Sequence, residues 1–483
     1  MGSPIAPNPM NPTLVDTLAP LSYGTCEVRL VRSADAPRFS ADEKECEASG
    51  AECGGGGLAM KIHLAYGRAG IDAELPDSAV VIEPVDAPPL PDERAAVVAG
   101  FRSPIGSRPL REIVGAGESV CIVTSDITRA TPNERLIPWI LDELAHVPAQ
   151  QIVVLIGTGS HRGQTPEEIE QMFGAQTARR VRIVNHDALQ LDETAVVGTT
   201  AEGQIARLNR HWVEADKRIV VGFIEPHLYA GFSGGPKGIM PAIADIDTIT
   251  CFHNARKISD PATTWLNLDG SPVQQMAREV AAMCPPDFCV NVTLNRDKAI
   301  TGVFCGHYLE AHRKGCDFCR ETASRPMPER FDVVVTTNGG YPLDQNLYQS
   351  IKGLTAAMGI VKQGGTIVLA CECSDGLPDH GNFKELIRSR ATAHDLMQMI
   401  LTPGFKAFDQ WSAQSMAQVL LHAKVHIKTA LHDDVVRSAL LQPIHDVSEA
   451  VRAAMQAAGP RATIAVLPDG PYTVPFVGAE SAI

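Results

Sequence analysis

The sequence contains no apolar run that approaches the roughly 20 residues of a membrane-crossing helix. Its first residues also lack the basic-then-apolar pattern of a secretory signal peptide. Basic residues are fewer than acidic ones, 42 against 56, so the formal net charge is −14. Binding to nucleic-acid phosphates or to an anionic membrane needs a basic surface, and neither partner is expected. We therefore expect a cytoplasmic protein with no nucleic-acid or membrane partner.

Three common motifs are incomplete in this chain. Cys316 and Cys319 form a CxxC without a second cysteine pair or a histidine pair at zinc-finger spacing, so we expect the twelve cysteines to be reduced thiols. The stretch GGPKG lacks the GxxxxGK[ST] spacing of a nucleoside-triphosphate loop. Gly157 and Gly159 lack the third glycine of a dinucleotide fingerprint.

A chain of 483 residues is too long for one core, and its composition changes near Met60. Residues 1–59 are rich in Pro, Ala and Ser, show no clear period and end in a glycine run. We expect 1–59 to be a disordered or mis-annotated N-terminal extension, with the native chain starting at Met60. The polar, Pro-containing stretch 320–330 predicts a boundary between two domains, 60–325 and 326–483.

From residue 60 onward, short apolar runs alternate with segments of helical spacing. In the first domain, strands are expected at 119–126, 151–158, 181–185 and 218–224, and helices at 132–147 and 165–180. In the second, strands are expected at 331–340, 364–373, 424–431 and 462–468, and helices at 343–361, 383–390, 393–401 and 412–424. This alternation predicts two α/β domains with mainly parallel sheets and an active site in the cleft between them.

Polar side chains follow most of the predicted strands. They are Asp126, Thr128 and Arg129; the run from Gly157 to Arg162; His186; Glu225 and His227; and, in the second domain, Asn338 to Gly340 before Tyr348, Gln349 and Lys352. Each has an ordinary structural interpretation, such as a salt bridge, a cap or a loop. Ligands of open α/β sheets bind beyond the carboxyl ends of the strands, so we expect these groups to converge.

Five stretches, in order, resemble the nickel-pincer lactate racemases and their 2-hydroxyacid racemase and epimerase relatives. They are SDITRATP, GTGSHRGQTPEE, EPHLYAGFSGGPKGIMP, CFHNAR and GYPLDQNLYQSIKG. The most specific part is the spacing of His227, Lys237 and His253. Ser125 departs from the family pattern where a second acid is expected, and Ala130 where proline is expected. Neither position carries a predicted role.

The resemblance implies a cofactor, the nickel-pincer nucleotide (pyridinium-3-thioamide-5-thiocarboxylic acid mononucleotide), which grips Ni(II) through sulfur, carbon and sulfur. Lys237 would form a thioamide with it, and His253 would complete a square-planar metal site. Gly234 and Gly235 would let the backbone approach the cofactor. Asp126 would support the cofactor sugar or the basic cluster. Enzymes that build the cofactor are implied as partners.

The resemblance also implies the reaction, inversion of C2 of a small 2-hydroxyacid such as lactate. Hydride leaves C2 for the pyridinium ring and returns to either face of the flat keto acid. Two hydroxyl positions then need two bases, which are matched by His161 and His227. The substrate-binding residues implied are Arg129, Tyr348, Gln349, Lys352 and Trp411. For Trp411, an ordinary core position is an equal alternative.

Other functions stay open at this point. The same cofactor could serve a 2-epimerase of a larger hydroxyacid, such as a sugar acid. A non-catalytic ligand-binding homologue would be expected to have lost some of these residues, whereas all are present. Lys237 as the Schiff-base nucleophile of an aldolase-like enzyme is a further alternative.

Overall fold

The structure is a computed structural model that describes residues 59–378 and 381–478. The extension expected over residues 1–59 thus lies outside the described residues, apart from Ala59, which begins strand β1 (Ala59–Leu64). No helix in the described ranges is long and apolar enough to cross a membrane.

The first large sheet has six strands in the order β13-β12-β9-β4-β5-β6. All neighbours pair in parallel except β12 and β13, which are antiparallel. The bounds are β4 Val120–Ser125, β5 Ile152–Gly157, β6 Arg182–Asn185, β9 Lys217–Phe223, β12 Phe288–Leu294 and β13 Ile300–Gly306. The four strands predicted in this region are therefore present and parallel to their neighbours.

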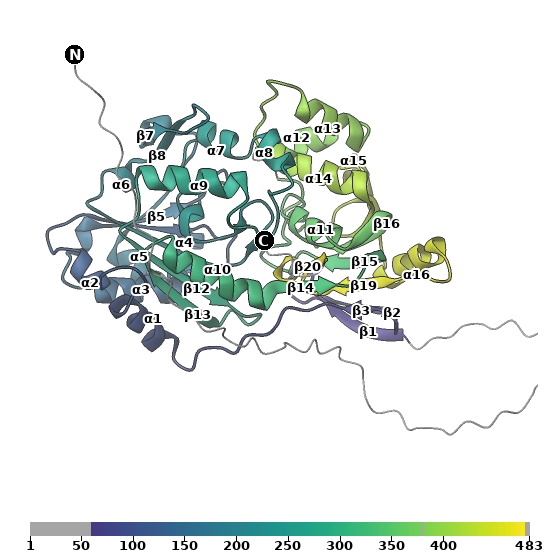
Figure 1. Cartoon of the computed structure of the whole chain (residues 1–483), viewed down its shortest axis with the longest axis horizontal. Coiled ribbons are helices and arrows are strands. Elements are labelled where there is room, and N and C mark those ends of the chain that lie inside the picture. The colour runs from purple at the N-terminus through teal and green to yellow at the C-terminus, as the bar shows by residue number, and fades with distance from the viewer. Residues whose placement is uncertain (1–58, 379–380, 479–483) are drawn as a thin grey trace, which may run out of the picture. The chain divides into compact units, whose positions relative to one another are not determined.

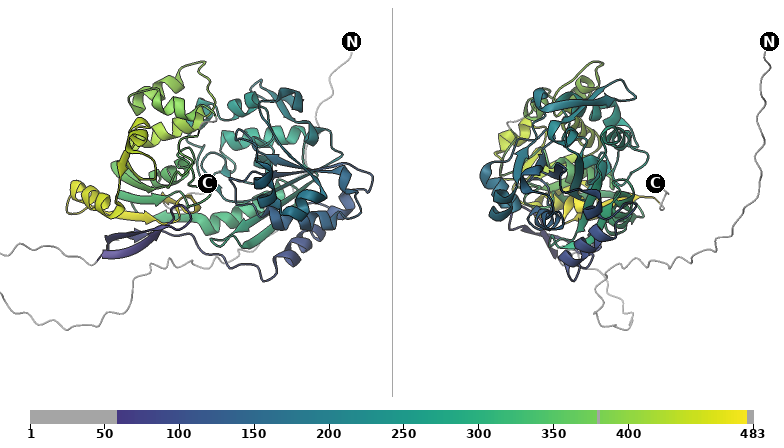
Figure 2. Two further views of the ribbon diagram at one scale, coloured as in Figure 1. Left: turned by 180° about the vertical axis from the view of Figure 1, so that it is seen from behind. Right: turned by 90° about the vertical axis from the view of Figure 1, so that its left-hand side faces the viewer.

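Helices cover both faces of the first sheet because successive strand residues point to opposite sides. On β4, Ile122 packs with α1 (Glu93–Arg102) and α3 (Asn133–Glu143), whereas Cys121 and Val123 pack with α9 (Pro272–Met283) and α10 (Glu310–Ala323). Figure 1 shows α9 and α10 in front of this sheet, and Figure 2 shows the same sheet from behind.

The second large sheet is entirely parallel, in the order β18-β17-β16-β15-β19-β3. The bounds are β3 Val80–Val81, β15 Phe331–Thr337, β16 Val361–Ala370, β17 Lys424–Lys428, β18 Gln442–Ile444 and β19 Ile464–Leu467. One face packs on α16 (Val447–Ala458) and on the ribbon of β1 and β2 (Ile71–Pro76). The other face packs on α11 (Ile351–Met358) and α14 (Gln410–His422). Two α/β parts with mainly parallel sheets are thus confirmed.

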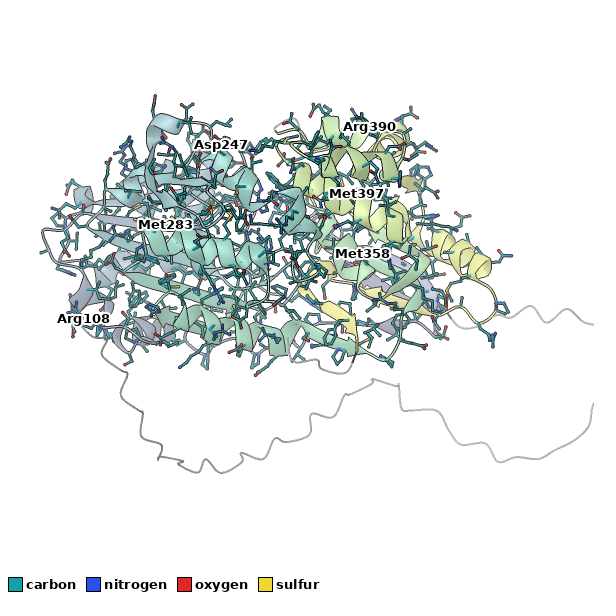
Figure 3. The ribbon with its side chains drawn as sticks, turned by 45° about the horizontal axis from the view of Figure 1, so that its top comes forward. Arg108, Asp247, Met283, Met358, Arg390 and Met397 are labelled. Carbon is teal, nitrogen blue, oxygen red and sulfur yellow. The ribbon has the colours of Figure 1, made fainter. Side chains whose placement is uncertain are left out.

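The remaining elements are short. Figure 3 marks the ends of two helices, Met283 in α9 beside the first sheet and Met358 in α11 beside the second. The other helices are α2 Leu110–Ile113, α4 Pro166–Phe173, α5 Ala175–Arg180, α6 Arg210–Val213, α7 Ile246–Phe252, α8 Ala255–Ser259, α12 Phe383–Arg388, α13 Ala393–Leu401 and α15 Asp433–Ser438. The other strands, all in two-stranded ribbons, are β7 Thr194–Thr199, β8 Ile205–Asn209, β10 Pro226–His227, β11 Gly231–Phe232, β14 Ser324–Met327 and β20 Val474–Val477.

Two predicted helices differ most from the observed ones, and a third, expected at 132–147, ends at Glu143. The helix expected at 165–180 is split into α4 and α5 at Gly174, whose φ of 76° is incompatible with a continuous helix. The helix expected at 343–361 is only α11, because side chains bind the backbone before it. Asn338 Nδ2 donates to the carbonyl of Leu343 at 2.6 Å, and Asn346 Oδ1 accepts from the amide of Gln349 at 3.1 Å.

The boundary predicted within 320–330 falls on regular structure, the end of α10 followed by β14. Strand β3, from early in the chain, is hydrogen-bonded to β19 of the second sheet. The domain limits 60–325 and 326–483 stay a prediction.

Candidate functional site

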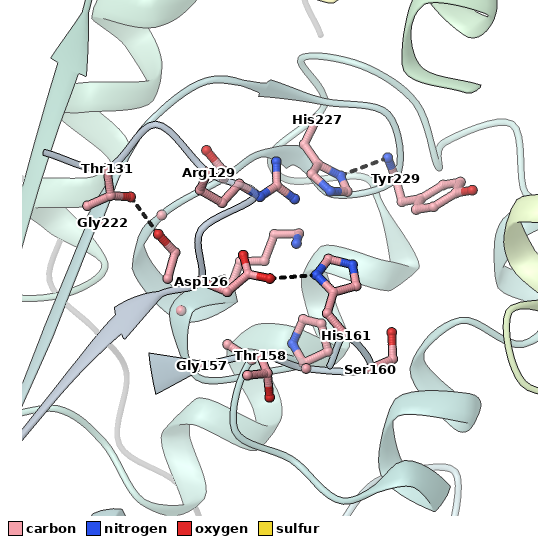
Figure 4. A pocket seen from close by; sticks show the side chains of 18 of the residues that line it. Asp126, Arg129, Thr131, Gly157, Thr158, Ser160, His161, Gly222, His227 and Tyr229 are labelled. Atoms are coloured by element: carbon pink, nitrogen blue, oxygen red, sulfur yellow. Dashed lines mark hydrogen bonds and ion pairs between the residues drawn. The ribbon is translucent and has the colours of Figure 1, made fainter. Parts of the chain in front are cut away.

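One cavity is lined by all twelve residues that the sequence singled out as site residues. They are Asp126, Arg129, His161, His227, Gly234, Gly235, Lys237, His253, Tyr348, Gln349, Lys352 and Trp411. The first eight follow strands or helices of the first sheet, and the last four come from the second, on or just before α11 and α14. Figure 4 shows the part of the cavity around Asp126, His161 and His227.

His161 is fastened through its Nδ1 atom, which lies 2.7 Å from Oδ2 of Asp126. Thr128 donates to the other carboxylate oxygen of Asp126 at 2.7 Å. Burial alone would raise the pKa of Asp126, but the charge of His161 and these hydrogen bonds hold it below its usual value. The carboxylate therefore accepts the Nδ1 proton and leaves Nε2 of His161 as the atom that can take up a proton.

His227 is also fastened through Nδ1, but by donors. The main-chain amides of Tyr229 and Ala230 donate to Nδ1 at 3.2 and 3.3 Å. Burial lowers the pKa of His227 well below its usual value, and the charges of Lys237 and Arg129 lower it further. The Nδ1 lone pair of neutral His227 is thus used by the two amides and its Nε2 carries the proton, whereas His161 has its Nε2 lone pair free.

Lys237 lies in a short 3-10 helix, η3 (Gly235–Gly238), reached through a glycine turn. A Cβ on Gly234 would lie 2.8 Å from Oδ1 of Asn291, and one on Gly235 would lie 2.4 Å from the His312 ring, so only glycine fits. Burial lowers the pKa of Lys237 to about 7, assisted by Arg129. A large share of this amine is neutral and nucleophilic near neutral pH.

His253 follows α7 and stacks on Trp411, with ring centroids 4.5 Å apart and planes at 26°. Its Nδ1 atom is buried without a hydrogen-bond partner. Burial lowers the pKa of His253 well below its usual value, which keeps the ring in the neutral form that binds metals. Among the described residues no three His, Cys, Asp or Glu side chains form a metal-binding group. The unpartnered Nδ1 atom of His253 fits a metal site whose other ligands a bound group such as a nickel-pincer nucleotide would supply.

Arg129 and Lys352 bring positive charge to the cavity from the two sides of the site. Arg129 Nη1 lies 2.5 Å from Oε1 of Glu225. Burial lowers the pKa of Lys352 well below its usual value, and the charge of Arg129 adds to this effect. An anion bound between the two cations would favour the charged form of Lys352.

Trp411 and Tyr348 line the cavity together, and the Tyr348 ring lies edge-on to His161 with ring centroids 6.3 Å apart. The indole Nε1 of Trp411 donates to the Tyr348 hydroxyl at 3.0 Å. Tyr229, which sequence reasoning did not single out, donates to the Trp411 carbonyl at 3.2 Å and lies 2.9 Å from the Ser415 hydroxyl. Its position between His227 and His253 in space could not be read from the motif that contains it.

Two groups at predicted strand ends have structural contacts instead. His186 is buried, and its Nε2 lies 2.9 Å from the carbonyl of Ala244. Asn338 binds the backbone of Leu343 and Gly353. Neither lines the cavity.

Comparisons with known proteins agree with the resemblance. The lactate racemase N-terminal domain matches residues 66–265, and the lactate racemase C-terminal domain matches residues 327–474. The chain is 35% identical over 382 residues to the lactate racemase of Thermoanaerobacterium thermosaccharolyticum, covering 78% of this chain and 89% of that protein. It is 35% identical over 381 residues to the lactate racemase of Lactiplantibacillus plantarum, covering 78% and 90%.

Two solved structures are also similar. The lactate racemase apoprotein of T. thermosaccharolyticum superposes with a TM-score of 0.80 at 32% identity, covering 87% of this chain and all of that one. A Thermotoga maritima protein superposes with a TM-score of 0.65 at 19% identity, covering 82% and all of that chain, and shows the fold alone. The chain belongs to the lactate racemase family, whose members are isomerases that act on hydroxy acids and use the nickel-pincer nucleotide.

Proposed function

We propose that this protein inverts C2 of a small 2-hydroxyacid, lactate or a close relative, with a nickel-pincer nucleotide held by Lys237 and His253. The observation that carries the proposal is the cavity itself. It combines two histidines that are both fixed through Nδ1, a lysine with a pKa of about 7 and a buried imidazole nitrogen without a partner. When bound, the cofactor would accept hydride from C2 and return it to either face.

The residues of the chain would handle the carboxylate and the proton. Arg129 and Lys352 would bind the substrate carboxylate, with Gln349 and Tyr348 beside it. His161 would take the hydroxyl proton at Nε2, and Asp126 would stabilise the resulting imidazolium through Nδ1.

His227 would serve the second hydroxyl position, again through Nε2. Because its Nδ1 atom accepts from two amides, neutral His227 carries its proton on Nε2. To take a proton at Nε2 it would first shift to the tautomer with hydrogen on Nδ1 and give up those two hydrogen bonds. The two histidines would therefore be unequal, because only His161 is fixed by a carboxylate in the tautomer that a base acting at Nε2 needs.

The active site in the cleft, the domain limits and a cytoplasmic location are part of this proposal. Residues of both sheets line the cavity, which supports the cleft. The cofactor-building enzymes are the partners that the proposal requires.

The proposal is tested by producing the chain with and without those enzymes. Intact mass should show a covalent adduct at Lys237 only in the first case. A panel of small 2-hydroxyacids and larger sugar acids, assayed by chiral chromatography, then identifies the substrate. Racemase activity in protein made without the cofactor-building enzymes would end the proposal.

A further inference from the structure

Glu225 stands behind the anion-binding side of the cavity. Arg129 lines the cavity, whereas Glu225 does not, and their 2.5 Å ion pair joins the two. Both side chains are largely buried, with 17% of Arg129 and 12% of Glu225 exposed. Ion pairs exposed to solvent contribute little to stability, but this pair is shielded from solvent.

The backbone of Glu225 is fixed at both of its polar groups. Its amide donates to the Ser233 hydroxyl at 2.9 Å, and its carbonyl accepts from the Ser233 amide at 2.9 Å. Ser233 in turn donates to the carbonyl of Phe223 at 2.8 Å. These bonds close the hairpin of β10 and β11 at its base. The carboxylate is therefore presented to Arg129 from a rigid position.

The same carboxylate acts on the other cations of the site. Burial lowers the pKa of Lys237 and of Lys352, and the charge of Glu225 opposes that shift in both. Asp126 opposes it as well, but Asp126 is engaged by His161. Glu225 is the carboxylate that is bonded directly to the predicted substrate clamp.

We propose that Glu225 is a positioning residue for the substrate carboxylate. Its carboxylate holds one edge of the Arg129 guanidinium from behind and leaves the remaining N–H groups to face the cavity. A guanidinium carries five N–H donors in a rigid fork, so fixing one edge orients the others. A side chain ordered before binding loses less freedom when the anion arrives. This inference rests on the proposed function.

The test uses Glu225→Gln, which keeps the length of the side chain and removes its charge, and Glu225→Asp, which keeps the charge and withdraws it by one methylene. Glu93→Gln is the matched control, because Glu93 forms a similar half-buried 2.5 Å pair with Arg135 away from the cavity. Cofactor-loaded enzyme is titrated with lactate, and Kd, KM and kcat are measured. Arg129→Lys and the double variant Glu225→Gln/Arg129→Lys complete a double-mutant cycle, which measures the coupling between the two side chains.

We expect both Glu225 variants to raise Kd and KM for lactate about tenfold, while kcat stays within about threefold, because the clamp binds substrate and transition state alike. Glu93→Gln should leave Kd and KM within about twofold of the parent values. In the Arg129→Lys background, Glu225→Gln should raise Kd by less than about a further twofold, because its effect passes through Arg129. Adduct mass and nickel content should match the parent enzyme.

Three results would overturn the inference. They are an unchanged or lower Kd in Glu225→Gln, an equal loss in both Arg129 backgrounds, and loss of the cofactor adduct in the Glu225 variants. If the parent enzyme racemises no hydroxyacid of the panel, the proposed function fails instead, and the two failures are thereby distinguished.

Discussion

Lys237 offers a direct chemical test in protein that carries no cofactor. Its pKa is lowered from 10.5 to about 7 by burial first and by the charge of Arg129 second. At pH 7 about half of the Lys237 amines should be neutral, whereas an ordinary lysine with a pKa near 10.4 is neutral in fewer than about one molecule in a thousand. The neutral fraction of Lys237 at this pH should therefore exceed that of an ordinary lysine by roughly a thousandfold.

The assay is acylation with a small reagent, such as acetic anhydride, over pH 5 to 10, read out by peptide mass spectrometry. Modification of Lys237 should rise with an inflection near pH 7. Lys257 is the control for burial, because its amine is held by Glu202 at 2.5 Å and should stay unmodified. Arg129→Gln should move the inflection upward, since a nearby positive charge is removed. An inflection above pH 9 at Lys237 would refute the reasoning.

The same shift has a consequence for stability. Between pH 7 and about 10, the unfolded chain binds a proton at Lys237 that the folded chain has released. Stability should therefore gain from this group as the pH rises through that window. Urea unfolding of the parent protein and of Lys237→Met, measured at several pH values, would detect this gain. The difference between their free energies of unfolding should become smaller as the pH rises.

Three further changes test single contacts of the site. Asp126→Asn should lower kcat roughly a hundredfold or more with little change in KM, because the imidazolium of His161 loses its partner; steady-state kinetics with a circular dichroism control would check this. Gly235→Ala should cost about 1–3 kcal/mol in urea unfolding, since the new Cβ meets the His312 ring at 2.4 Å. His253→Ala should lose nickel on metal analysis, and full retention of nickel would refute its role as a ligand.

Eight of the twelve strands in the two large sheets could be predicted from their apolar runs, whereas β3, β12, β13 and β18 were missed. Runs such as 119–126 and 151–158 match β4 and β5 to within one residue at each end. The helix expected at 343–361 could not be predicted correctly, because its first half is held by contacts with residues distant in sequence. Asp344, for example, accepts from the amides of Gly67 and Glu372.

The site residues could be gathered from the sequence, but not their contacts. Parallel strands bring their carboxyl ends to one edge, so the grouping of Asp126, His161 and His227 follows from the fold. The pairing of Asp126 with His161, and of Glu225 with Arg129, depends on side-chain directions in three dimensions. No spacing in the sequence distinguishes these pairs from other carboxylates and cations.

The fate of the hydrogen on C2 tests the central claim most directly. Cofactor-loaded enzyme is given a single enantiomer of lactate carrying deuterium at C2, in ordinary water, and the inverted product is analysed by mass spectrometry. Hydride transfer to and from the cofactor predicts that the product keeps its deuterium. Replacement of the label by solvent hydrogen would show proton abstraction and contradict the account.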